Sequence, residues 1–459
     1  MADILKKIIE HKQQEVARFK ADRPLESFLH DVKATERDFL AALKKPGPRF
    51  ILECKKASPS KGLIRENFDL NELSTVYGDY ADCISVLTDQ EFFQGSYDNL
   101  SQMRALVQQP LLHKDFIIDP YQIYLGRLCG ADAVLLMLSV LTDDEYRQLH
   151  EVASAFSMTV LTEVSNEEET KRAVELKAQL IGINNRDLRD LSTDLNTSAR
   201  LRTLIPDTTT VVSESGIHTN QQVRQLSKVA DAFLVGSSLM AQANLTLACK
   251  KLTRGEHKVC GLTRPEDVAA VHQAQACYGG LIFYPKSPRA VNLEQAKSLV
   301  EQAKLLFVGV FVDEPADQVN RIATELQLAA VQLHGDESDD YIRALREQLP
   351  KQTEIWKAYR VHDRLPDFTE LADRLVLDTY QPDAPGGTGQ QFNWQLLSQL
   401  TTERPVMLAG GLQASNINEA LQQPVAGLDL NSGLETEPGV KAADKMTTAF
   451  QIIREFHYE

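Results

Sequence analysis

Charged and amide side chains recur in the first half of the chain, each near the end of a short apolar segment or just after it. They are Glu53, Lys55, Lys114, Glu163, Asn184, Arg186 and Glu214. A strand-end salt bridge or a helix cap would explain any one of them, but separate caps have no reason to gather at one place. Carboxylate and ammonium groups held close together shift each other's pKa values, as general acid–base catalysis requires. The pattern therefore predicts one acid–base site.

The second half carries a different pair of reactive groups. Cys260 lies in an apolar segment and Asp378 follows another. A cysteine in such a segment is usually inert core packing, so it is the pairing of one thiol with one carboxylate that indicates chemistry. His334 and Arg289 follow two further apolar segments, and the guanidinium group of Arg289 is suited to hold an anion.

Glycines and small polar residues follow the last two apolar segments of each half. They are Ser215, Gly216, Gly236 and Ser237 in the first half, and Gly410, Gly411, Asn431, Ser432 and Gly433 in the second. Such residues leave backbone N–H groups open to bind a phosphate. Each half is therefore predicted to bind a phosphorylated small molecule, with different catalytic groups in the two halves.

Short apolar, β-rich segments position these residues, eight in each half, and they alternate with helical patterns. They span 50–54, 83–88, 111–116, 133–138, 159–164, 180–184, 210–213 and 232–236, then 258–261, 281–284, 306–312, 330–333, 355–358, 375–377, 406–409 and 427–430. Eight such parallel strands predict a closed (β/α)₈ barrel, whose active site lies at the carboxyl ends of the strands.

We therefore predict an α/β protein of two consecutive TIM barrels, at 1–255 and 256–459, the first with an N-terminal helical extension at 3–20. The alternative in each half is an open doubly wound sheet. That fold is disfavoured, because the Gly-x-Gly-x-x-Gly loop expected after a first strand is missing from both halves.

Composition and charge narrow the class of protein. The chain has 459 residues and a formal net charge of −15, which makes nucleic acid and anionic membranes poor partners. We recognise no signal peptide and no segment of the roughly 18 apolar residues that cross a bilayer, so we expect a cytoplasmic protein. The six cysteines show no CxxC pair and the ten histidines no HxxxH pair, which predicts reduced thiols and no metal site.

The motifs at the segment ends resemble two enzyme families. In the first half, residues 53–60, 114–116, 162–164, 182–188 and 213–216 closely resemble indole-3-glycerol phosphate synthase. In the second half, residues 260–264, 287–289, 332–335 and 386–389, with Phe392 and Trp394, resemble phosphoribosylanthranilate isomerase. Together they resemble the bifunctional fusion of these two enzymes, a decarboxylating lyase and an isomerase of tryptophan biosynthesis.

For the second half, the resemblance implies an Amadori rearrangement of N-(5′-phosphoribosyl)anthranilate to 1-(2-carboxyphenylamino)-1-deoxyribulose 5-phosphate. Asp378 would protonate the ribose ring oxygen and open the ring to a Schiff base. Cys260 would then remove the C2′ proton to give an enolamine, which tautomerises to the ketone. Because this step needs an activated thiol, we expect Cys260 to be partly exposed and more reactive than the other five cysteines.

For the first half, the resemblance implies a ring closure that releases carbon dioxide and water and yields indole-3-glycerol phosphate. Lys114 would protonate the C2′ carbonyl as the ring carbon attacks, and Glu163 and Lys55 would assist the dehydration. Glu53 and Asn184 would hold the network, and the division of acid and base work stays open. Glu214 is a further candidate for catalysis, and Ser58, Ser60 and Arg186 are candidates for binding the substrate. Neither reaction needs a metal or an organic cofactor.

Three alternatives remain at this stage. One barrel could be inert, although an inert half would be expected to lose its strand-end charges and neither half has. A phosphate-ligand sensor on a barrel scaffold would not need the pair Cys260 and Asp378 or the pair Lys114 and Glu163. A sugar-phosphate aldolase would use Lys114 as a Schiff-base nucleophile. Because one chain supplies both barrels, we expect a monomer.

Overall fold

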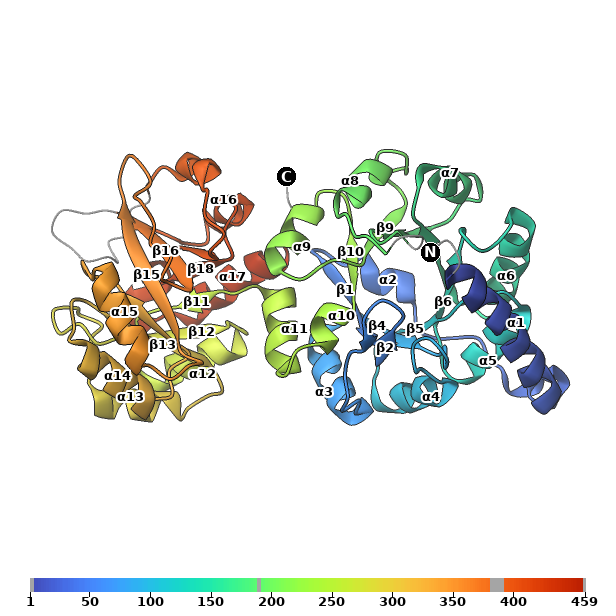
Figure 1. The fold of residues 1–459 in the computed structure, drawn as a ribbon, viewed down its shortest axis with the longest axis horizontal. Helices are drawn as coiled ribbons and strands as arrows, with labels where there is room; N and C mark the ends of the chain where they lie inside the picture. Colours follow the sequence, from blue (N-terminus) through green and yellow to red (C-terminus); the bar gives the residue numbers. More distant parts are fainter. Residues whose placement is uncertain (1–3, 188–190, 380–391, 457–459) are drawn as a thin grey trace. The chain divides into compact units, whose positions relative to one another are not determined.

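The computed structural model describes residues 4–187, 191–379 and 392–456, and the chain divides into two compact units. The first unit extends to Cys249 without Thr219–Arg224, which belong to the second unit together with Lys250–Phe456. Each unit is built around one closed barrel of parallel strands with helices on its outer side (Figure 1). The predicted fold of two consecutive TIM barrels is therefore confirmed.

The first barrel closes in the order β1-β10-β9-β8-β7-β6-β5-β4, with every neighbouring pair parallel. Its strands are β1 (Arg49–Cys54), β4 (Cys83–Leu87), β5 (Leu111–Lys114), β6 (Ala133–Met137), β7 (Thr159–Val164), β8 (Leu180–Asn184), β9 (Thr210–Glu214) and β10 (Ala232–Val235). Every residue of β4 and β6 is buried, because helices cover the outer face of the sheet and the core fills the inner one. These strands therefore appear in the sequence as continuous apolar segments.

Helices follow these strands along the chain. They are α3 (Leu70–Tyr80), α4 (Tyr97–Leu106), α5 (Pro120–Leu128), α6 (Asp143–Ala155), α7 (Glu167–Glu175), α8 (Asn196–Arg202), α9 (Asn220–Leu226), α10 (Ser237–Met240) and α11 (Leu245–Arg254). Asparagine, aspartate, serine or threonine side chains cap the starts of several of them; Thr142, for example, forms a capping box with Glu145 at the start of α6. Such caps stop each helix from extending back into the preceding loop.

A helical extension precedes β1, as predicted. It consists of α1 (Ile4–Asp22), the short 3₁₀ helices η1 (Leu25–Ser27) and η2 (Leu29–Asp31), and α2 (Phe39–Leu43). Phe28 and Val32 pack with Tyr121 and Leu125 of α5 in one apolar cluster. Burial of these side chains attaches the extension to the outside of the barrel.

The last helix of the extension supplies part of the barrel core. Asp38 caps α2 by accepting a 2.8 Å hydrogen bond from the Ala41 N–H. Phe39 and Leu43 are fully buried against inward-facing strand residues that include Ile51 and Leu112. The sequence of α2 therefore completes a core that the strands alone would leave open.

The second barrel closes in sequence order from β11 to β18, again with parallel neighbours. Its strands are β11 (Lys258–Val259), β12 (Tyr278–Ile282), β13 (Leu306–Phe311), β14 (Ala330–Leu333), β15 (Glu354–Val361), β16 (Arg374–Thr379), β17 (Val406–Leu408) and β18 (Gly427–Leu430). Its helices are α12 (Pro265–Gln273), α13 (Leu293–Val300), α14 (Ala316–Glu325), α15 (Asp339–Gln348), α16 (Ile417–Gln422) and α17 (Ala443–Arg454), with the 3₁₀ helices η3 (Trp394–Gln399) and η4 (Ser432–Leu434).

Within its described residues, each barrel carries one small antiparallel hairpin beyond the regular pattern. In the first barrel β2 (Ala57–Ser58) pairs with β3 (Gly62–Leu63) after β1, and in the second β19 (Glu435–Glu437) pairs with β20 (Val440–Lys441) after β18. Both hairpins follow the carboxyl end of a strand, so they bring additional side chains to the end where the predicted sites lie. Among the described residues, no helix combines the length and apolar character that crossing a bilayer requires.

Replacing Phe39 by alanine should destabilise the first barrel selectively. Removing a buried phenylalanine costs about 3–5 kcal/mol, and Phe39 is fully buried. The chain has two tryptophans, Trp356 and Trp394, both in the second unit, so tryptophan fluorescence follows the second barrel. In urea titrations of Phe39→Ala, the circular dichroism transition should begin at lower urea while the fluorescence midpoint stays unchanged. An equal shift of both signals would contradict selective destabilisation.

Candidate active sites

The charged residues of the first barrel meet at the carboxyl ends of its strands. Lys114 ends β5, and its Nζ lies 3.7 Å from a carboxylate oxygen of Glu163 on β7. It lies equally 3.7 Å from an oxygen of Glu214 on β9. Asn184, the last residue of β8, donates a 3.3 Å hydrogen bond to Glu163. Four strands therefore bring one ammonium, two carboxylates and an amide together.

Burial and charge pairing set the ionisation of this group. Burial opposes ionisation of Glu53, but its ion pair with Lys55 and the nearby Lys114 hold its pKa below the usual range. Burial raises the pKa of Glu214 to about 8, and the carboxylate of Glu163 adds to this rise against the attraction of Lys114. The surrounding carboxylates raise the pKa of Lys114 despite its burial. At neutral pH the site therefore holds groups that can donate protons.

Two glycines make room for these carboxylates. A Cβ atom on Gly182 of β8 would overlap Glu214 Oε1, and a Cβ atom on Gly236, after β10, would overlap Glu53 Oε1. A side chain larger than hydrogen at either position would displace the carboxylate. These glycines therefore leave the space that the two carboxylates of the site occupy.

The predicted phosphate-binding residues of the first barrel lie in two loops at the same end. Ser215 and Gly216 directly follow β9 and have left-handed backbone, with φ of +69° and +81°. Gly236 follows β10 and precedes α10, which begins at Ser237. Left-handed turns and helix starts leave N–H groups available for an anion.

The predicted residues Ser58, Ser60 and Arg186 also come together. Ser58 ends β2, and its Oγ lies 3.4 Å from the Oγ of Ser60 in the hairpin turn. Arg186, shortly after β8, donates a 3.1 Å hydrogen bond to Ser60. The β2–β3 hairpin and the loop after β8, far apart in sequence, therefore meet beside the charged group.

The second barrel holds a cavity of about 440 Å³ at the carboxyl ends of its strands. Its lining includes the predicted residues Cys260, Arg289, His334, Asp378, Gly410, Gly411, Asn431 and Ser432. The predicted Gly433 does not line this cavity. A Cβ atom there would overlap the carbonyl oxygen of Leu412, so Gly433 allows two loops to pack closely.

Cys260 lies beside a buried ion pair. Lys258, at the start of β11, donates to Asp429 at 2.7 Å and to Gln332 at 2.8 Å. Cys260 is only 6% exposed. Burial raises the pKa of its thiol, although the Lys258 ammonium opposes the rise. The expectation of a partly exposed thiol is therefore wrong, because the strand end packs inside the barrel; the half-buried cysteine is Cys129.

Asp378 lies opposite a neutral histidine. Its Oδ2 is 3.5 Å from His334 Nε2. Burial raises the pKa of Asp378 to about 6 and lowers that of His334 to about 3. The amide nitrogen of Gln332 lies 3.2 Å from His334 Nδ1 and donates to it, which leaves the imidazole proton on Nε2, facing Asp378. Asp378 can therefore keep a transferable proton up to about pH 6, well above the range of an exposed aspartate.

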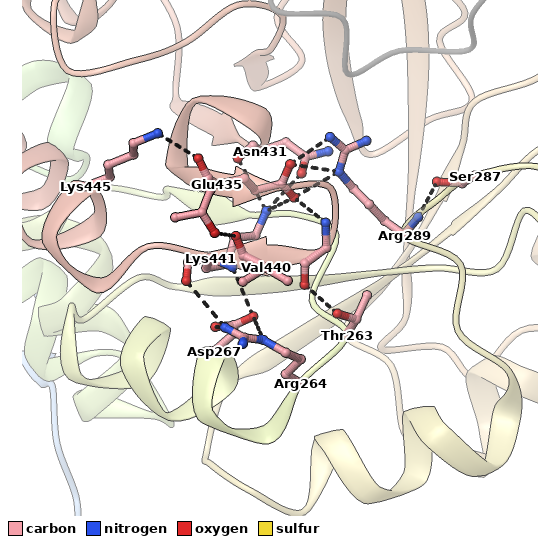
Figure 2. Close-up of polar contacts among 12 residues, drawn as sticks. Thr263, Arg264, Asp267, Ser287, Arg289, Asn431, Glu435, Val440, Lys441 and Lys445 are labelled. Carbon is pink, nitrogen blue, oxygen red and sulfur yellow. Dashed lines mark hydrogen bonds and ion pairs between the residues drawn. The ribbon is translucent and has the colours of Figure 1, made fainter.

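Arg289 is held from the side of the second hairpin (Figure 2). Its Nε and Nη2 donate to the carboxylate of Glu435 at 2.9 and 2.7 Å. Lys441 donates to the same carboxylate at 2.9 Å and to Asn431 Oδ1 at 3.0 Å. The pair between Arg289 and Glu435 orients the guanidinium plane at the wall of the cavity. Nη1 takes no part in this pair.

Part of two predicted motifs lies outside the described residues. The structure does not describe the glycine-rich segment 386–389 of the isomerase-like motifs or residue 188 of the synthase-like motifs. Phe392 and Trp394, which follow the glycine-rich segment, are buried.

Comparison with known proteins decides the family. Residues 5–252 match the family described as indole-3-glycerol phosphate synthase, and residues 257–452 match the family described as N-(5′-phosphoribosyl)anthranilate (PRA) isomerase. The chain belongs to both families. The resemblance seen in the motifs is therefore confirmed, with the synthase barrel first and the isomerase barrel second.

Full-length relatives have the same arrangement. The tryptophan biosynthesis protein TrpCF of Vibrio cholerae is 54% identical over 457 residues, which cover 99% of this chain and 97% of that protein. The protein of the same description from Salmonella typhi is 50% identical over 458 residues, which cover 99% of this chain and 100% of that protein. The chain is thus a bifunctional indole-3-glycerol phosphate synthase and phosphoribosylanthranilate isomerase of tryptophan biosynthesis.

Three charged residues of the isomerase barrel were not among the predicted site residues. Lys258 and Asp429 lie inside apolar strand segments, and a charge in such a segment is itself a signal that it points into the barrel mouth towards a partner. Glu435 lies beyond the last strand, on a hairpin that no strong turn pattern predicts. Only its contact with Arg289 identifies it.

Gly182→Ala should impair the synthase without unfolding it. The added methyl group displaces the flexible carboxylate of Glu214 and disturbs its pairing with Lys114, and misplaced groups of this kind reduce turnover by about tenfold or more. Steady-state assays of both reactions should show a lower synthase kcat and an unchanged isomerase kcat. The matched control is Gly78→Ala in α3, where a Cβ atom meets nothing within 4 Å. Equal synthase activity of the two variants would contradict this account of Gly182.

Proposed function

We propose that each barrel performs its reaction with the polar groups gathered at the carboxyl ends of its own strands. The isomerase barrel would convert N-(5′-phosphoribosyl)anthranilate to the ribulose phosphate, and the synthase barrel would close the indole ring. The observation that carries this proposal is the difference between the two sites. One pairs a lysine with two glutamates, and the other combines a thiol with a protonatable aspartate.

In the isomerase barrel Asp378 acts as the general acid. Its raised pKa lets it protonate the ribose ring oxygen, which opens the ring to a Schiff base. The neutral imidazole of His334, 3.5 Å away, adds no positive charge that would lower this pKa. Cys260 then removes the C2′ proton in its thiolate form, which is the minor form at neutral pH because burial raises the pKa of the thiol; the adjacent Lys258 ammonium favours this anion. The resulting enolamine tautomerises to the ketone.

Two anionic groups of the isomerase substrate need separate partners. Gly410 and Gly411 follow β17 with left-handed backbone, at φ of +86° and +64°, and with Ser432 they offer the phosphate site. Arg289 offers the second anion site, for the substrate carboxylate. Glu435 holds the Arg289 guanidinium in one orientation (Figure 2), so less side-chain freedom is lost when the anion binds.

In the synthase barrel Lys114 protonates the C2′ carbonyl oxygen while the ring carbon attacks, and carbon dioxide leaves. Its ammonium is held 3.7 Å from Glu163 and Glu214. Loss of water then completes the ring, with Lys55 and Glu163 as the acid–base pair. Glu214, with its pKa raised to about 8, keeps a proton within this network at neutral pH.

Binding in the synthase barrel completes the assignment. The substrate phosphate is assigned to Ser215, Gly216, Gly236 and Ser237, and the substrate carboxylate to Lys55 and Ser58, with Ser60 and Arg186 beside them. Glu53 and Asn184 hold the catalytic side chains: Glu53 pairs with Lys55, and Asn184 bonds to Glu163. The ligands are small phosphorylated molecules, without a metal or organic cofactor in either step.

The boundary between the two domains is placed at residues 255 and 256. This choice is supported by the family matches, which end at 252 and begin again at 257. We further assign the protein to the cytoplasm as a monomer. None of the six cysteines, all within the described residues, forms a disulfide, which is consistent with a reducing compartment.

Single substitutions should separate the two activities. Cys260→Ala should lower the isomerase rate by about 10²–10⁴-fold, because it removes the base, and leave the synthase nearly intact. Lys114→Ala should have the reverse effect, so that the ribulose phosphate accumulates. The assay supplies phosphoribosylanthranilate without added metal and follows loss of its fluorescence and formation of indole-3-glycerol phosphate. A substitution that disabled both reactions would contradict separate sites.

The isomerase should lose ring-opening activity as the pH rises. The pKa of Asp378 is raised from 3.8 to about 6, so its carboxyl group is mostly protonated below that pH and loses its proton above it. Because ring opening consumes this proton, the rate of this step should fall as the pH rises from about 6 to about 8. The single-turnover rate of fluorescence loss follows it under conditions in which ring opening is slower than proton removal by Cys260. Asp378→Asn should abolish the reaction. A rate that rises over this range would contradict Asp378 as the acid.

A further inference from the structure

The helical extension of the synthase barrel carries a lysine that water does not reach. Lys12 on α1 is fully buried. Its Nζ lies 2.9 Å from Asp89 Oδ2 and 2.8 Å from Asp115 Oδ1, and it also pairs with Glu15 on the same helix. Lysine side chains usually reach the surface, and burying a charge costs several kcal/mol unless it is well paired. The contact of α1 with the barrel therefore includes a buried, paired charge, whereas docking of a helix usually rests on apolar side chains.

One partner of Lys12 supports the segment that carries Lys114. Asp115 is the next residue after Lys114, and its Oδ1 also accepts a 2.8 Å hydrogen bond from the Phe116 N–H. Its Oδ2 accepts a hydrogen bond from Thr88 Oγ1, and the Thr88 N–H donates to the Lys114 carbonyl oxygen at 3.2 Å. The direction in which β5 ends, and with it the position of Lys114, is thereby tied to the ammonium of Lys12.

A second partner of Lys12, Asp89, supports the surroundings of Lys55. Asp89 lies after β4, and its Oδ1 accepts a 2.8 Å hydrogen bond from the Phe92 N–H. The next residue, Phe93, places its ring centroid 5.8 Å from Lys55 Nζ. The Phe93 carbonyl oxygen also accepts a 3.3 Å hydrogen bond from the Ala57 N–H at the start of the β2–β3 hairpin. One buried ammonium therefore connects two loops that hold the two catalytic lysines.

The charge balance shows what this ammonium does for its neighbours. Three carboxylates, those of Glu15, Asp89 and Asp115, face it inside the protein. Burial opposes the charge, but the carboxylates outweigh it and raise the pKa of Lys12. Without the ammonium, these carboxylates would repel one another, and the loops that carry them would separate.

We propose that Lys12 is a positioning residue for indole ring closure: it holds the strand-end segments that place Lys114 and Lys55. This inference rests on the proposed roles of these two lysines. Lys12 acts through Asp89 and Asp115 and takes no part in the chemical steps. The N-terminal extension thus belongs to the catalytic apparatus of the synthase barrel.

The test compares two lysines of the same helix in the full chain. Lys12→Met removes the buried ammonium. The matched control, Lys20→Met, removes a half-exposed ammonium that pairs with Asp119 at 2.6 Å. Isomerase activity in the same chain serves as an internal measure of intact protein. Both reactions are assayed well below the unfolding temperature of each variant.

Lys12→Met should lower the synthase kcat by about tenfold or more and raise KM by a smaller factor. The loops after β9 and β10, assigned to the phosphate, are not part of the Lys12 cluster, whereas Lys55, assigned to the carboxylate, is supported by it. Amide hydrogen exchange should accelerate in residues 88–96 and 114–118. Lys20→Met should change neither, and isomerase activity should be unchanged in both variants. An unchanged kcat for Lys12→Met, an equal loss in Lys20→Met or an equal loss of isomerase activity would overturn the inference.

A second variant covers the case in which Lys12→Met does not fold. Asp89→Asn keeps the ammonium and reduces the negative charge around it, so the fold should be retained while the loop after β4 loosens. Its synthase kcat should fall by a few-fold without loss of isomerase activity, and an unchanged kcat would overturn the inference. Lys114→Ala separates the two claims: if it remains active as a synthase, the proposed function fails, whereas an inactive Lys114→Ala with unaffected Lys12 and Asp89 variants refutes only the positioning role.

Discussion

The two sites depend on one constraint: an ammonium placed inside a barrel must find carboxylates on other strands. An unpaired buried charge costs several kcal/mol, so the strand register must place each buried ammonium beside a carboxylate of another strand. Lys114 meets Glu163 and Glu214 from β7 and β9, and Lys258 meets Asp429 from β18. These pairs have a stabilising role and a chemical one, because they set which groups hold protons at neutral pH.

The same architecture yields different chemistry because the neighbours of the key carboxyl group differ. Glu214 lies among like charges and a lysine, and its pKa is raised to about 8. Asp378 faces the neutral His334; the carboxylate of Asp429 adds to the effect of burial while Lys258 and Arg360 oppose it, and its pKa is raised to about 6. Burial is the largest cause in both sites, and the surrounding charges then adjust the result. In the proposed mechanisms, a carboxyl group therefore belongs to a network in the synthase barrel and acts as a single acid in the isomerase barrel.

Much of the fold could be predicted from the sequence, because few folds accommodate eight apolar strands that alternate with helices. Many candidate site residues could be predicted as well, because the carboxyl ends of the strands identify the mouth of each barrel. What could not be predicted depends on contacts between distant segments. The burial of Cys260 follows from how β11 packs, and the pairing of Glu435 with Arg289 follows from a hairpin after the last strand. Lys12 reads as one more charge on an amphipathic helix, and only tertiary packing shows that it is enclosed.

The continuity of the chain at the end of the synthase barrel also has a consequence for metabolism. The helix α11 ends at Arg254 and β11 begins at Lys258, so both catalysts are translated as one polypeptide. Every ribosome that completes the chain makes them in equal number, and transcription cannot change their ratio. Whether the intermediate accumulates in the cell is then set by the relative rate constants of the two barrels, and selection can adjust that balance only through amino-acid substitutions in one of them.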